Sequence, residues 1–168
     1  MTIEALNAAI RSPALKSVAR HWAEVRGSRR MPGWSDIRPS RVVRQLPIVW
    51  AYTYDRETDT FTARLAGDRI ETIFGKAFRQ TPLADIFPKS GFQDVFDRAK
   101  RVVSEPAVCR SEGLVLPQVN KFGYGERVML PLASDGICAD GILGCTEYRS
   151  TDGPYDDARP QTDEWFSL

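Results

Sequence analysis

The chain has one histidine, three cysteines, almost no net charge and no long apolar run. Because His21 is its single histidine, a Ser-His-Asp triad or a Cys-His pair could form only around that residue, and no catalytic residues are expected. Its 23 Lys and Arg against 22 Asp and Glu give a net charge of +1, which argues against general attraction to nucleic acid or anionic membranes. At 168 residues the chain is long enough for one hydrophobic core and one domain.

The cysteines Cys109, Cys138 and Cys145 are odd in number and show no C-x-x-C spacing. This pattern is typical of reduced thiols and not of a disulfide framework. A Cys₃His zinc site with His21 has suitable residue types but lacks knuckle spacing, so no metal is expected. Glu4 stands where a signal peptide would carry Lys or Arg, and the apolar stretches are too short to span a bilayer. A cytoplasmic location is therefore predicted.

The N-terminal part predicts a helix followed by a connector. Ser12 and Pro13 suit the N-cap and the first helical position. An apolar stripe at helical spacing follows, formed by Leu15, Val18, Ala19, Trp22 and Val25. Residues 26–44 show little periodicity and hold six arginines against Asp36. We expect residues 1–45 to form this helix and an Arg-rich connector, residues 46–149 the main domain, and residues 150–168 an acidic C-terminal tail.

The main domain has the pattern of an antiparallel sheet interrupted by helices. Five strands are predicted, at Ile48–Tyr54, Phe61–Leu65, Ala107–Val115, Glu126–Ala133 and Gly141–Tyr148. Helices are predicted at Asp68–Phe74, between Thr81 and Pro88, and between Ser90 and Pro106. This order excludes a doubly wound parallel sheet. It predicts an α+β fold: a five-stranded antiparallel sheet with short helices on one face and an N-terminal amphipathic helix.

Short motifs in a fixed series suggest a family. They are His21-Trp22, Arg26, Arg29-Arg30-Met31-Pro32, Asp36-Ile37-Arg38-Pro39, Leu46-Pro47, Phe61–Ile70 and Phe74-Gly75. Together they resemble the lead-in, second strand and first core helix of a bacterial family of single-domain PAS proteins, over most of the chain from Trp22 to Glu147. The resemblance implies a sensory or adaptor domain whose first strand lies between the second and the last.

The cofactors that many PAS domains carry are not expected here. A flavin photoreceptor would need a cysteine in the core helices, and Asp68–Phe74 and Thr81–Phe87 contain none. A haem sensor would need an axial histidine there. His21 lies in the leading helix instead, where we expect it to be solvated or locally hydrogen-bonded. The sequence leaves open whether the domain binds an unidentified small ligand.

Strand parity brings a set of apolar side chains together on the sheet. One strand contributes Trp50, Tyr52 and Tyr54, and the next contributes Phe61, Ala63 and Leu65. Five further residues are expected to close over them: Phe74, Phe96, Met129, Leu143 and Cys145. The set describes either a packed core or a mostly apolar ligand pocket, because the small Ala63 and the flexible Met129 leave room for both.

These observations favour a non-catalytic cytosolic sensor or adaptor that acts through association with an unknown signalling protein. One alternative is a small enzyme that uses Tyr52 or Arg64. Another is nucleic-acid binding through the Arg26–Arg44 connector, although pairing of its arginines with Asp36 and loop carbonyls is favoured.

The apolar stripe of the leading helix also predicts a partner. An exposed stripe of this size would be a liability on a monomer, so either the chain's own sheet or a second copy must cover it. The resemblance favours a homodimer, with Leu15, Val18, Ala19, Trp22 and Val25 in the interface and Trp22 near the twofold axis.

Overall fold

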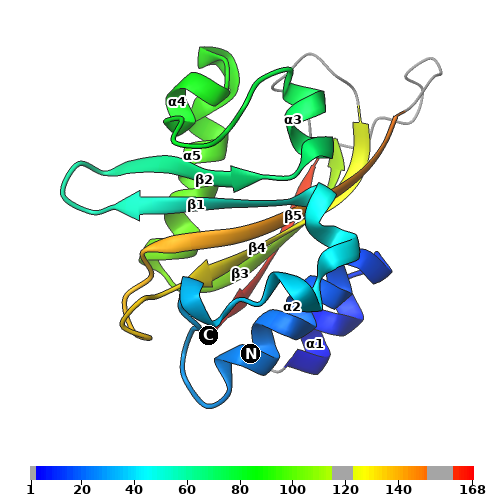
Figure 1. The fold of residues 1–168 in the computed structure, drawn as a ribbon, viewed down its shortest axis with the longest axis vertical. Coiled ribbons are helices and arrows are strands. Elements are labelled where there is room, and N and C mark those ends of the chain that lie inside the picture. The colour runs from blue at the N-terminus through cyan, green and yellow to red at the C-terminus, as the bar shows by residue number, and fades with distance from the viewer. Residues whose placement is uncertain (1–2, 115–122, 151–160) are drawn as a thin grey trace.

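A six-stranded antiparallel sheet forms the centre of the computed structural model, which describes residues 3–114, 123–150 and 161–168 (Figure 1). The strands are β1 (Val49–Asp55), β2 (Thr60–Ala66), β3 (Ala107–Leu114), β4 (Gly123–Leu132), β5 (Gly141–Ser150) and β6 (Thr162–Ser167). They are ordered β2-β1-β5-β4-β3-β6. The first strand lies between the second and the fifth, so the predicted α+β class and its five strands are confirmed.

The sixth strand corrects the prediction of a C-terminal tail. β6 pairs antiparallel with β3, and its acidic residues are bound to arginines on both sides of the sheet. Asp163 Oδ2 lies 2.8 Å from Arg98 Nε, and Glu164 Oε1 lies 2.6 Å from Arg110 Nη1. Both residues are exposed, as the sequence indicated, but they also pair with cations in the fold. Val115, the predicted end of the third strand, and residues 151–160 of the predicted tail lie outside the described residues.

Helices cover both faces of the sheet (Figure 1). On one side are α3 (Asp68–Phe74), α4 (Leu83–Ile86) and α5 (Lys89–Ser104); on the other are α1 (Ile3–Ala9) and α2 (Pro13–Arg26). We call the side toward α3–α5 the inner face and the side toward α2 the outer face. α5 begins one residue before the predicted Ser90. None of the helices in the described part of the chain is both long and apolar enough to cross a membrane.

Helix α2 begins as the sequence predicts, but its apolar stripe packs on the chain's own sheet. Ser12 Oγ accepts a hydrogen bond from the Leu15 N–H at 3.1 Å. Trp22 is fully buried, and its Nε1 donates to the carbonyl of Pro131 in β4 at 2.9 Å. The stripe residues Leu15, Val18, Ala19 and Trp22 are all buried, and Val25 is half-buried. This corrects the expectation that they are left free for a second copy.

A buried ion-pair network fastens the junction of α1 and α2 to the outer face. The Glu126 carboxylate accepts from the backbone N–H groups of Arg11 at 2.9 Å and Ser12 at 2.7 Å. Arg110 Nε donates to Glu126 at 2.6 Å, and its Nη2 donates to Glu112 at 2.6 Å. Side chains of the middle strands therefore hold the start of α2, which positions the helix over the sheet.

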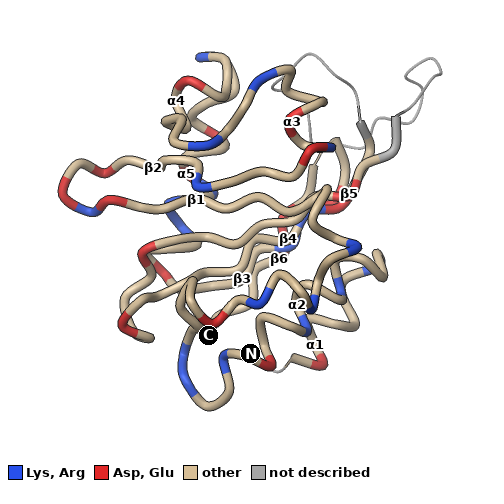
Figure 2. The backbone as a smooth tube through the Cα atoms, viewed as in Figure 1, with Lys and Arg blue, Asp and Glu red and all other residues tan. Residues whose placement is uncertain are grey.

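The connector crosses the outer face as three short 3₁₀ helices, η1 (Trp34–Asp36), η2 (Pro39–Arg41) and η3 (Val43–Ile48). The loop between α2 and η1 carries basic residues (Figure 2). Arg29 Nη1 lies 2.8 Å from Asp36 Oδ2, and its Nη2 donates to the Val25 carbonyl at 2.7 Å. This confirms the predicted pairing with Asp36, whereas the carbonyl that Arg29 binds belongs to the last turn of α2 and not to a loop.

Candidate functional site

The inner face of the sheet carries the aromatic residues that strand parity predicts. The rings of Trp50 and Tyr52 lie 4.8 Å apart, and those of Tyr54 and Phe61 lie 4.6 Å apart. Phe61 also meets Phe96 of α5 in an edge-to-face contact at 5.8 Å. Ala63 pairs with Tyr52 and so shares its face. The core of the predicted set is therefore brought together.

Three residues of the predicted set lie on the other face. The register between β1 and β2 shifts at Ala51 and Tyr52, so that Leu65 pairs with Ala51 whereas Ala63 pairs with Tyr52. This bulge adds one residue to β2 and turns Leu65 to the outer face. Cys145 also pairs with an outer-face residue, Val49. The expectation that Leu65 shares a face with Phe61 and Ala63 is therefore wrong. Leu143, which pairs with Ala51, and Cys145 are also turned outward, so they do not close over that face as predicted.

A small cavity lies between the inner face and the helices. Its lining comes from Trp50, Tyr52, Arg127, Met129 and Thr146 of the sheet and from Ile70, Phe74, Phe78, Phe87, Val95 and Arg98 of the helical side. Its volume is about 30 Å³, which holds a water molecule or two. In this conformation the predicted set is closer to a packed core than to an open pocket.

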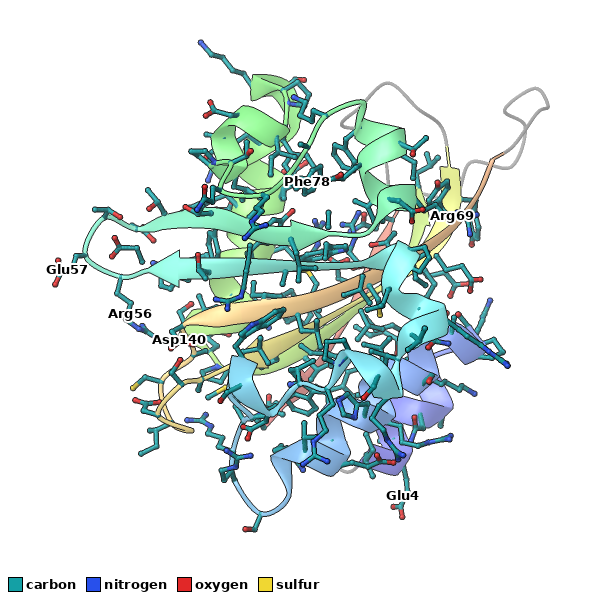
Figure 3. All side chains as sticks on the ribbon, in the orientation of Figure 1. Glu4, Arg56, Glu57, Arg69, Phe78 and Asp140 are labelled. Atoms are coloured by element: carbon teal, nitrogen blue, oxygen red, sulfur yellow. The ribbon has the colours of Figure 1, made fainter. Side chains whose placement is uncertain are left out.

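Three phenylalanines close the cavity on its helical side, and we call them the phenylalanine cover. Phe74 ends α3, Phe78 lies in the segment before α4, and Phe87 follows α4. Phe74 contacts Phe78 edge-to-face at 5.0 Å and Phe87 at 5.3 Å. Figure 3 shows Phe78 in the region between α3 and α5. The size of the cavity therefore depends on how this short helical segment sits on the sheet.

A buried cation forms part of the cavity wall. Arg127 in β4 is 8% exposed, and its Nε donates to Thr146 Oγ1 at 3.4 Å. The same oxygen accepts from Trp50 Nε1 at 3.0 Å. Burial lowers the pKa of Arg127 to about 10, so the guanidinium stays charged at neutral pH. Arg98, a second lining residue, is ion-paired with Asp163 of β6. Sequence analysis singled out neither arginine, although a basic residue amid a buried apolar strand is a usable signal.

The residues proposed for an enzyme do not form a catalytic arrangement. Burial raises the pKa of Tyr52, so the phenol stays protonated at neutral pH. Arg64 is exposed and stacks on Trp34, with its guanidinium 4.5 Å from the ring centroid. Burial raises the pKa of Cys109 to about 12 and also raises that of Cys145, which suppresses both thiolates. Within the described ranges, no three His, Cys, Asp or Glu side chains gather as metal ligands would.

Gly144 of β5 allows the Trp50 ring to lie flat on the sheet. The two residues pair across β1 and β5, and a Cβ at position 144 would overlap the ring atoms of Trp50. We expect Gly144→Ala to lower the free energy of unfolding by about 1–3 kcal/mol through overpacking. Urea denaturation measures this cost. In a Trp50→Leu background the same change should cost less than in the wild type; equal costs in both backgrounds would contradict the contact.

A family model described as a PAS domain matches residues 10–147 of the chain. That range begins just before α2 and extends into β5, so it includes the connector, the phenylalanine cover and the inner cavity. No curated protein and no solved structure matches the chain.

Proposed function

Because the chain belongs to the PAS domain family, a family of sensory and signalling modules, we propose that it is a non-catalytic sensor or adaptor. Its signal is a small acidic molecule bound in the inner cavity, and its output is association with another protein. The main support is Arg127, a buried guanidinium in the wall of a cavity that is otherwise mostly aromatic and aliphatic.

The cavity wall defines the chemistry of the ligand. Trp50, Phe74 and Phe78 offer ring faces and edges to a flat apolar body. The positive charge of Arg127 attracts a carboxylate, and this attraction is stronger in a site that excludes water. A small aromatic carboxylic acid combines both features.

Binding has to move the phenylalanine cover, because about 30 Å³ holds no molecule of this size. The three rings belong to the segment that contains α3 and α4, so a ligand that displaces them also shifts this surface of the domain. Such a shift converts occupancy of the cavity into a change that a partner protein can recognise.

Partner association is proposed to use a surface other than the α2 stripe, which the chain's own sheet covers. A homodimer is likewise proposed to form through a surface other than this stripe. Because Arg29 in the connector is already bound to Asp36, protein association is favoured over nucleic-acid binding. The cytoplasm is the proposed location, since it would keep Cys109, Cys138 and Cys145 as free thiols.

Titration with benzoate, followed by methyl NMR, tests the cavity. We expect shifts of the Met129, Ile70 and Val95 methyl signals, and at least about tenfold weaker binding by Arg127→Met. Methionine is apolar and close to arginine in length, so this variant should fold. Arg101→Met is the control, because Arg101 stacks on Trp165 and does not line the cavity.

The ligand proposal fails if benzoate and a panel of larger aromatic acids leave these three methyl signals unchanged. It also fails if Arg127→Met and Arg101→Met bind equally well, because the charge in the cavity would then play no part.

A further inference from the structure

A larger cavity lies on the outer face, where α2 and the connector cross the sheet. Its floor is formed by Val49, Leu65 and Leu143, and its walls include Val18 and His21 of α2. The volume is about 320 Å³, which falls in the range of small-molecule sites, about 300–1,000 Å³. The sheet separates it from the inner cavity, so the two can be occupied independently.

The local fold explains why this space exists. The bulge in β2 turns Leu65 toward it, and the connector spans the floor instead of packing flat on it. Trp34 of η1 forms another wall and is held by Arg64, which stacks on its ring at 4.5 Å. Most of the lining is apolar, so the cavity suits an apolar body.

His21 and Ser35 are polar residues in the lining of this cavity, and the hydrogen bonding of His21 is incomplete. The side chain is 4% exposed, and its Nε2 accepts from the backbone N–H of Arg38 at 3.0 Å. Because a backbone amide can only donate, Nε2 is unprotonated and Nδ1 carries the proton of the neutral ring. Nδ1 is shut off from the open space of the cavity and has no hydrogen-bond partner among the residues that the structure describes, so an acceptor reaches it only when neighbouring side chains shift. A buried donor of this kind is unfavourable unless something else accepts its proton.

Burial keeps the His21 ring neutral. It is the main cause that lowers the pKa of His21; the charge of Glu24 opposes this effect, and the charges of Arg41 and Arg38 add to it. The ring is therefore neutral at neutral pH and remains a donor through Nδ1. Arg41 is itself paired with Glu24 at 3.8 Å, so Arg38 supplies the positive charge near His21 that attracts an anionic ligand.

We propose that the outer cavity binds a small aliphatic carboxylic acid, with its chain on Leu65 and Leu143 and a carboxylate oxygen accepting the Nδ1–H of His21. The ligand touches α2, the connector and the sheet together. Its binding therefore holds the N-terminal helix on the domain, and this site is distinct from the inner cavity of the proposed function.

Octanoate is the probe, and methyl NMR is the readout. We expect octanoate to shift the methyl signals of Val18, Val49 and Leu143 and to leave those of Met129 and Ile70 unchanged. Octylamine, which has the same chain and a cationic head group, is the control ligand and should bind more weakly.

Two substitutions separate the roles of the histidine nitrogens. His21→Gln places an acceptor near Nε2 for the Arg38 N–H but lacks the Nδ1 donor, and we expect it to weaken octanoate binding at least about tenfold. His21→Asn keeps a donor near Nδ1 and should bind within a few-fold of the wild type. Circular dichroism shows whether each variant is folded.

Three results would overturn this inference. One is the absence of shifts at Val18, Val49 and Leu143 up to millimolar octanoate. The second is a set of shifts confined to Met129 and Ile70, which would place the acid in the inner cavity and support the proposed function alone. The third is equal binding by folded His21→Gln and the wild type.

Discussion

Replacement of Trp22 by alanine should lower the free energy of unfolding by about 3–5 kcal/mol. The side chain is fully buried between α2 and the sheet, and its Nε1 donates to the Pro131 carbonyl at 2.9 Å. Alanine removes the largest side chain of the stripe and leaves that carbonyl without its donor. Urea denaturation monitored by circular dichroism gives the value.

The matched control is Val25→Ala on the same helix. Val25 is half-buried, so its truncation should cost much less than that of Trp22. Sedimentation of both variants shows whether oligomeric state changes with stability. A Trp22→Ala protein that is as stable as the wild type and merely dissociates would show that the stripe packs on a second copy.

Arg110→Ala should be similarly costly, at about 3–5 kcal/mol. The Arg110 side chain is 4% exposed, and it is ion-paired with Glu112, Glu126 and Glu164 at 2.6 Å each. Its removal leaves the buried Glu126 carboxylate without its cation and loosens the junction that Glu126 holds. The loss is measured by urea unfolding at neutral pH.

Two comparisons make this prediction specific to the buried network. Arg41→Ala removes an exposed pair with Glu24 at 3.8 Å and should cost less than about 1 kcal/mol. Arg110→Met with Glu126→Gln should recover part of the loss, because the carboxylate is removed together with its cation. A cost for Arg110→Ala no larger than that for Arg41→Ala would show that the network does not fasten α2.

The hairpin and the helices could be predicted because their signals are local. β1 alternates aromatic residues on one face, and α3 ends at Gly75, whose φ of 66° suits glycine. The faces of β5 could not be predicted in the same way. Residues 141–146 are all buried, since helices cover both sides of this strand, so no alternation shows whether Cys145 points in or out.

The other missed features depend on contacts between distant segments. Leu65 changes face because β2 gains a bulged residue opposite β1, which the composition of β2 does not reveal. β6 was missed because its exposed carboxylates, Asp163 and Glu164, are also typical of a tail, and their pairing with Arg98 and Arg110 depends on the folded arrangement. Arg127 was missed for a related reason, since its burial depends on helices packed over β4.

A crystal structure of the chain with benzoate would show whether the inner cavity is the ligand site. We expect the acid in the inner cavity, with its carboxylate within hydrogen-bond distance of Arg127 and with Phe78 displaced from its contact with Phe74. Benzoate bound elsewhere, with Phe78 and Arg127 unmoved, would contradict it.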